Sequence, residues 1–155
     1  MSVSERLAEL GIELPSVVPP VAAYIPAKVH GDLVYTAGQL PMVSGALPQT
    51  GKVGEGEGLV TPDAAAGYAR QSALNAIAAA AAAAGGVDRL AGVLKVTGFV
   101  ASVPEFTGQP GVINGASTVL GEIFGDAGRH ARSAVGVPVL PLDAPVEIEV
   151  VFTLV

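Results

Sequence analysis

The chain has 155 residues, an ordinary size for one domain, and no cysteine, which excludes a disulfide framework, a thiolate nucleophile and a cysteine-ligated metal site. Fourteen acidic residues outnumber eight basic ones, and the formal charge of -6 argues against nucleic acid as a partner. Half of the residues are hydrophobic and only 14% are charged, a balance typical of a subunit that buries surface in an oligomer, although an alanine-rich genome would produce the same balance.

The first 20 residues are predicted to form an N-terminal extension packed on a single domain, residues 21–155. Within the extension, Ser4 to Leu10 is expected to be a short amphipathic helix, which a serine can cap and which Gly11 and Pro15 would end. Charged residues lie where a signal peptide needs an apolar core, and no stretch reaches the roughly 18 apolar residues of a membrane span. We therefore expect a cytoplasmic protein without a membrane partner.

The segment from Val21 to Ala37 is predicted to be a β-hairpin. Its β-prone residues are interrupted by His30-Gly31-Asp32, which suits a tight turn, and Leu33 to Thr36 would form its second strand. From Gly38 to Gly58 the chain is rich in glycine, proline and polar residues. This composition indicates a long surface loop.

Two helices are expected after this loop. Thr61-Pro62-Asp63 opens the first with a capping residue, a proline suited to the first turn and an acid that complements the positive helix end, and Gly85-Gly86 ends it. Its alanine-rich run, Ala76 to Ala84, predicts a thin helix that can lie close to a sheet. The second helix is indicated by apolar residues at helical spacing from Ile113 to Phe124.

Three further strands are predicted over Leu94 to Val100, Ala134 to Leu140 and Val146 to Leu154. The order is thus hairpin, helix, strand, helix, strand, strand, which indicates an α+β fold with the helices on one face of a sheet. The last strand has apolar residues on both of its faces. Its second face therefore needs a cover, which again indicates an oligomer.

Two charged residues are the candidates for chemistry. Arg132 lies at the start of a predicted strand among small residues, and its planar guanidinium matches a carboxylate in two parallel hydrogen bonds. Glu147 lies between Val146 and Ile148, where apolar neighbours could raise the pKa of its carboxyl and let it hold or activate a water. From sequence alone, a surface or salt-bridged arginine and the polar side of a strand, shared with Glu149, are the more ordinary interpretations.

The other polar motifs favour no further site. His30 and His130 have no metal-ligand spacing, so no metal is expected. The run Gly54 to Gly58 carries acids where a phosphate-binding loop needs open N–H donors. No histidine and acid set that would form a triad is visible around Ser133.

Several stretches, taken together, resemble the RidA/YjgF family of reactive-intermediate deaminases, from about Tyr24 to the C-terminus. The most specific is the closing block, which is Ala131 to Val137, Leu140-Pro141 and Val146 to Glu149. The others are Val34 to Pro41, Val93 to Val100 and Asn114. The N-terminal extension is typical of a separate subgroup of the family.

The resemblance implies a chorismate-mutase-like α+β fold, with a mixed sheet and two main helices on one face. It implies a homotrimer whose sheets form a central barrel and whose three clefts lie between neighbouring subunits. It also implies that Arg132 binds the carboxylate of a small substrate and that Glu147 holds the reacting water. The positions that would line the pocket are Tyr24, Gly38, Asn114 and the backbone around Ala134.

The implied activity is hydrolysis of small 2-imino or enamine acids to a 2-keto acid and ammonia, with no cofactor. Arg132 would fix the carboxylate while Glu147 orients water and shuttles protons. Two positions depart from the main deaminase branch, since Ala134 stands where cysteine is common and Ala37 where a small hydroxyl is common. The alternative is a non-catalytic protein of the same fold that senses a small carboxylate. A ribonuclease activity, sometimes attributed to the family, fits this acidic chain poorly.

Overall fold

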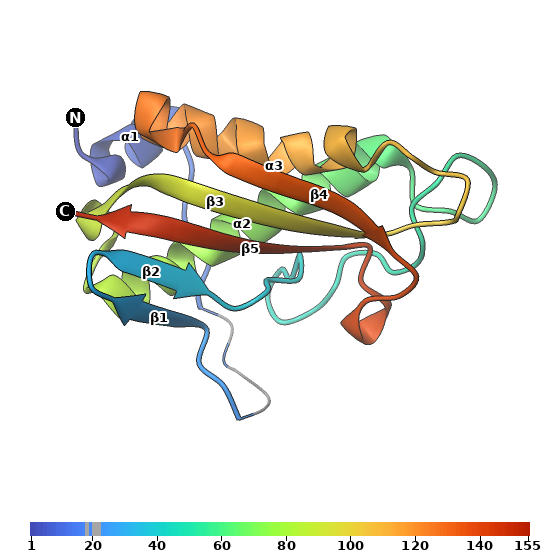
Figure 1. The fold of residues 1–155 in the computed structure, drawn as a ribbon, viewed down its shortest axis with the longest axis horizontal. Coiled ribbons are helices and arrows are strands. Elements are labelled where there is room, and N and C mark those ends of the chain that lie inside the picture. Colours follow the sequence, from blue (N-terminus) through green and yellow to red (C-terminus); the bar gives the residue numbers. More distant parts are fainter. Residues whose placement is uncertain (18, 20–22) are drawn as a thin grey trace.

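One mixed sheet of five strands, in the order β1-β2-β5-β3-β4, organises the computed structural model, which describes residues 1–17, 19 and 23–155 (Figure 1). The strands are β1 (Ala27–His30), β2 (Leu33–Thr36), β3 (Leu90–Ala101), β4 (Ala131–Val137) and β5 (Val146–Leu154). β3 and β4 pair in parallel, whereas the other neighbours are antiparallel. The predicted α+β fold with a mixed sheet is confirmed.

Two long helices, α2 (Pro62–Ala84) and α3 (Gln109–Phe124), lie side by side on one face of this sheet (Figure 1). The start of α2 is capped as predicted, because the Thr61 side chain accepts a hydrogen bond from the Ala64 backbone N–H. Within the described ranges, no helix is long and apolar enough to cross a membrane.

The two helices approach each other closely at Gly115 of α3. A Cβ atom at this position would overlap the backbone carbonyl oxygen of Ala66 in α2. A glycine is therefore needed where the two helices cross, and the small side chains of α2 serve the same close packing.

The hydrophobic core lies between the helices and the sheet, and the alternation of β5 marks its two faces. Val146, Ile148, Val150 and Phe152 are at most 1% exposed. The residues between them are more exposed and point to the other side of the sheet. We call the side away from α2 and α3 the open face.

Three elements differ from the prediction by several residues at one or both ends. α3 begins at Gln109 and β3 begins at Leu90, both earlier than expected. The prediction for β4 was wrong at both ends, because its parallel pairing with Lys95–Ala101 of β3 fixes it at Ala131–Val137, directly before Pro138, which has no N–H for a ladder. Arg132 consequently lies inside a strand. The predicted domain boundary after residue 20 and the predicted hairpin start at Val21 lie outside the described residues.

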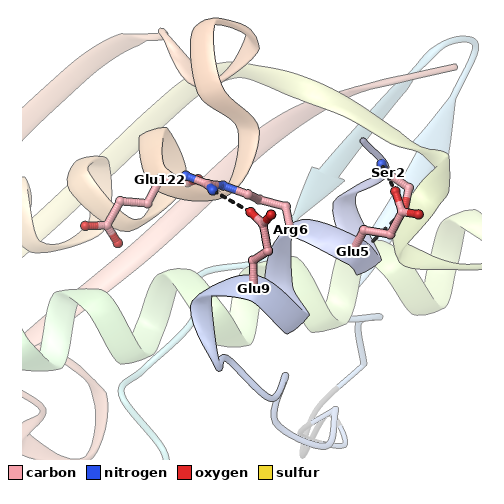
Figure 2. Close-up of polar contacts among 5 residues, drawn as sticks. All are labelled: Ser2, Glu5, Arg6, Glu9 and Glu122. Carbon is pink, nitrogen blue, oxygen red and sulfur yellow. Dashed lines mark hydrogen bonds and ion pairs between the residues drawn. The ribbon is translucent and has the colours of Figure 1, made fainter.

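The N-terminal helix α1 (Val3–Leu10) is held at both its start and its middle. Ser2 caps it in a reciprocal arrangement with Glu5 (Figure 2). The Ser4 backbone N–H and hydroxyl both donate to the Asp88 carboxylate, at 2.8 and 2.7 Å. These hydrogen bonds lower the pKa of Asp88, with the backbone donor as the largest cause.

Arg6 joins α1 to the end of α3. Its Nε donates to the Glu122 backbone carbonyl oxygen at 2.8 Å, and its Nη1 pairs with Glu9 at 2.9 Å (Figure 2). A cation at the last carbonyls of a helix complements the helix dipole. Leu7 is buried against the core on the same helix.

Candidate active site

A cavity of about 290 Å³ contains three of the predicted site residues, Tyr24, Gly38 and Glu147. Its other walls are mostly apolar and are formed by Pro19, Pro26, Gln39, Leu40, Met42, Pro141 and Leu142. Among these described lining residues, Glu147 alone carries a charge. A small apolar cavity with one carboxylic acid is suited to bind a small organic substrate.

The Glu147 side chain lies on the open face, because its neighbours Val146 and Ile148 are buried on the helix face. Its carboxyl group rests against the backbone of Gly38, where a Cβ atom would lie only 2.7 Å from Oε1. Gln39 fixes this backbone by exchanging hydrogen bonds of 2.7 and 3.0 Å with Ile148. The absence of a side chain at Gly38 thus makes room for the carboxyl.

Burial raises the pKa of Glu147 above the ordinary value of 4.5, and the nearby Glu149 carboxylate adds a smaller push in the same direction. The carboxyl therefore holds its proton to a higher pH than a solvated glutamate does. A carboxyl whose pKa is raised is a better proton acceptor when it is ionised than a solvated glutamate is.

The wall of the cavity beside Glu147 includes a strained turn. Leu142 and Asp143 have φ values of 59° and 57°, which side-chain-bearing residues rarely adopt. Two contacts hold Asp143 there: its carbonyl oxygen accepts from the Gly51 N–H at 2.9 Å, and its carboxylate pairs with Lys52 at 2.6 Å. The turn thereby presents the largely exposed Leu142 side chain to the cavity.

Arg132 lies on the helix face of the sheet. It is paired across the strands with Val96, which is completely buried under the helices, and paired residues share a face. Its guanidinium lies over the first turns of α3, where Nη1 donates to Asn114 Oδ1 at 2.8 Å and to Ser117 Oγ at 3.2 Å. Nη2 donates to the Pro110 carbonyl oxygen at 3.3 Å.

These three contacts leave two donors of the Arg132 guanidinium unused among the described residues. A guanidinium has five N–H donors, and these bonds use three of them, which leaves the Nε–H and one Nη2–H without a partner among the described residues. Within the described part of the chain, no carboxylate forms an ion pair with Arg132. A half-buried guanidinium with two unused donors fits a carboxylate ligand.

Ala134 lies two residues beyond Arg132 on β4 and packs against the edge of the core. β4 is the last strand of the sheet, so one side of its backbone is unpaired in the described chain. The backbone here is free to bind a ligand or a neighbouring molecule.

The structure thus divides the predicted residues into two groups. The first is Tyr24, Gly38 and Glu147, and the second is Asn114, Arg132 and Ala134. The groups lie on opposite faces of the sheet, since Glu147 alternates with buried residues of β5 whereas Arg132 points toward α3. Within one chain, therefore, Arg132 and Glu147 do not face a common cavity.

Sequence reasoning missed Ser117 and gave no role to His130, yet both lie beside Arg132. His130 Nε2 is 2.9 Å from Ser117 Oγ, and His130 Nδ1 is 2.6 Å from the Gly128 carbonyl oxygen. The helical spacing of Asn114 and Ser117, three residues apart, was the one available signal. The approach of His130 depends on how the chain turns back after α3.

Comparisons with known proteins agree with this fold. The model of the YjgF/chorismate-mutase-like family, described as putative endoribonuclease, matches residues 4–154. Protein TCP17 of Trypanosoma cruzi is 39% identical over 148 residues, which cover 95% of this chain and 91% of that protein.

Two solved structures are similar over nearly the whole chain. Atu1372 from Agrobacterium tumefaciens, a protein of unknown function, is 42% identical with a TM-score of 0.87, covering 99% of this chain and 92% of the other. A putative endoribonuclease from Shewanella oneidensis is 31% identical with a TM-score of 0.92, covering 99% and 100%. The chain belongs to the YjgF/RidA family, as its closing sequence block predicted.

Proposed function

We propose that this protein is a hydrolytic deaminase of small 2-imino or enamine acids, which releases ammonia and a 2-keto acid. The observation that carries the proposal is the half-buried Arg132 guanidinium, which has two unused N–H donors and no carboxylate partner among the described residues. The Glu147 carboxyl, with its raised pKa, supports it as the proton-carrying group.

The active protein in this proposal is a homotrimer, because the two groups of residues can meet only across two copies. The β4 edge of one subunit, which carries Arg132, would lie beside the Glu147 cavity of the next. A repeated head-to-tail contact of this kind closes into a ring. The open faces would then line a central barrel. Exposed apolar side chains near these surfaces, Tyr35 and Val135 among them, favour such burial.

In the proposed mechanism, the Arg132 guanidinium binds the substrate carboxylate and holds the adjacent imine carbon toward Glu147. The ionised Glu147 accepts a proton from water as the water oxygen bonds to that carbon and the C=N π bond opens, and Glu147 then gives this proton to the nitrogen. In the resulting carbinolamine, the hydroxyl proton moves by way of Glu147 to the amino nitrogen as the C–N bond breaks, so that ammonia leaves and a keto group remains. Positioning and one proton carrier supply the acceleration. The apolar cavity walls would receive the substrate side chain.

A second candidate is a non-catalytic protein that binds the same carboxylates. The methyl side chains of Ala37 and Ala134 favour it, because they offer no hydroxyl or thiol at positions that often carry one in the main branch. The two candidates share Arg132 as the ligand-binding residue and differ in whether ammonia is released.

The test measures ammonia and keto acid from imines that an amino-acid oxidase generates in the assay. We expect Arg132→Lys and Glu147→Gln each to lower kcat/KM by about 100-fold or more, since a bidentate donor or the proton carrier is lost. Arg129→Lys and Glu122→Gln, which change exposed side chains outside the two groups of site residues, serve as matched controls. A rate that added protein does not change over several substrates refutes the deaminase, and keto-acid binding without turnover favours the second candidate.

A further inference from the structure

We infer that Ser117 and His130 are positioning residues for Arg132, which hold its guanidinium so that its unused donors can bind the substrate carboxylate. Their consequence for catalysis rests on the proposed function, whereas the hydrogen bonds that define them are properties of this chain. The roles proposed for Arg132, Glu147 and Asn114 do not involve Ser117 or His130.

The hydrogen bonds that join Gly128, His130, Ser117 and Arg132 fix which atom donates at each step. The Gly128 carbonyl oxygen can only accept, so the proton of the His130 ring lies on Nδ1. In the neutral ring, Nε2 is then an acceptor, and it takes the hydroxyl hydrogen of Ser117 at 2.9 Å. This leaves the lone pairs of Ser117 Oγ to accept from Arg132 Nη1 at 3.2 Å.

His130 keeps the Ser117 hydroxyl turned away from its own helix. A serine inside a helix commonly donates to the backbone carbonyl four residues earlier, which here is that of Ile113. His130 offers the hydroxyl a better-placed acceptor outside the helix. Ser117 can therefore complete the set of acceptors on Nη1, of which Asn114 is the other.

The position of His130 is itself fixed by the turn η2 (Gly125–Gly128) that follows α3. Gly128 is buried against this helix, and a Cβ atom there would lie 2.7 Å from the Leu120 carbonyl oxygen. Only glycine allows this approach, which aims the Gly128 carbonyl at the His130 ring. The chain then enters β4, so the helix, the turn and the strand converge on the guanidinium.

Loss of Ser117 removes one acceptor of Nη1, and loss of His130 lets the Ser117 hydroxyl turn back to its own helix, so either loss lets the guanidinium rotate toward solvent. The carboxylate would then bind to a mobile cation and no longer to a fixed one. We expect KM to rise about tenfold, the cost of roughly one hydrogen bond, with kcat changed less than about threefold. Glu147 and the cavity lie on the other face of the sheet and should be unaffected.

The kinetic test compares Ser117→Ala and His130→Leu with variants that keep the acceptors. Ser117→Thr keeps the hydroxyl, and His130→Gln keeps an acceptor near the Nε2 position, so both should remain within about threefold of the wild-type KM. Thr118→Ala and His30→Leu remove an exposed hydroxyl and an exposed imidazole as matched controls. Conservative variants as impaired as Ser117→Ala and His130→Leu would overturn the inference.

Nitrogen-15 NMR of the arginine side chains tests the same inference without any substrate. The wild-type Arg132 guanidinium should give separate Nη signals because its rotation is hindered, and the signals should merge in Ser117→Ala and in His130→Leu. Arg132→Lys identifies the signals among the five arginines. Unchanged signals in both variants overturn the positioning role even in an active enzyme. Merged signals support the positioning role even if imine hydrolysis is never found. Failure of this inference can therefore be told apart from failure of the proposed function. If Ser117→Ala does not fold, His130→Leu tests the positioning role, because His130 lies outside α3.

Discussion

Alanine at position 38 is expected to impair catalysis while leaving the fold intact. The new Cβ atom would lie 2.7 Å from Glu147 Oε1 and Cδ, whereas ordinary contacts begin near 3.4 Å, so the carboxyl must move by about 0.7 Å. Gly38 does not have a positive φ, and the displaced atoms are the end of a flexible side chain. We therefore expect the free energy of unfolding to fall by less than about 1 kcal/mol. A displacement of this size at a reacting group should lower kcat by about 10- to 100-fold.

The assay for this prediction pairs kcat for imine hydrolysis with denaturant unfolding of the same preparations. Gly67→Ala in α2 is the matched control, because its new Cβ atom has no neighbour within 4 Å. It should keep wild-type activity. Gly38→Ala with wild-type kcat would refute the reasoning, and so would a loss of activity that merely follows unfolding.

Three further predictions concern stability. Glu147→Gln should be more stable than the wild type at pH 7, because the raised pKa of Glu147 means that the fold disfavours the ionised carboxyl. The difference in stability should vanish as the pH falls toward 4.5. Denaturant unfolding at a series of pH values measures this difference, and a difference that does not change with pH contradicts the prediction. Gly115→Ala should lower the free energy of unfolding by about 3 kcal/mol or more, because its Cβ overlaps the Ala66 carbonyl, and an unchanged Tm would show that the helices do not cross there. Asp88→Asn should speed amide hydrogen exchange over Val3–Leu10, because it weakens the acceptor of the two Ser4 hydrogen bonds, while α3 keeps its protection. Equal exchange in the variant and the wild type argues against docking of α1 through Asp88.

The elements with local signals were predicted well. The capping residues of α2, the turn after His30 and the alternation of β5 each lie within a few residues of the structure that they specify. β4 was misplaced because its position follows from pairing with β3, some 35 residues earlier, and pairing of this kind leaves no local pattern. The start of α3 was missed because Pro110 and Gly111 carry no helical periodicity.

The candidate site was predictable by residue type and not by arrangement. Arg132 and Glu147 were selected by their sequence blocks, and the structure does bring Asn114 to Arg132 and Gly38 to Glu147. Their separation on opposite faces depends on the register in which β4 and β5 pair with β3, and this register joins segments that are distant in the sequence. His130 was set aside for lack of metal spacing, because its contact depends on the turn after α3.

Mixing two single variants tests most directly the proposed cleft, in which Arg132 of one subunit lies beside Glu147 of the next. Arg132→Ala and Glu147→Gln are each expected to be inactive alone, because every cleft lacks one of the two groups. After joint refolding in equal amounts, about a quarter of the wild-type activity should return, since mixed rings regain one intact cleft in three. Mixing Arg132→Ala with the double variant is the control and should restore nothing. If the two single variants form mixed trimers and remain inactive, Arg132 and Glu147 do not share a cleft, and the proposed mechanism is wrong.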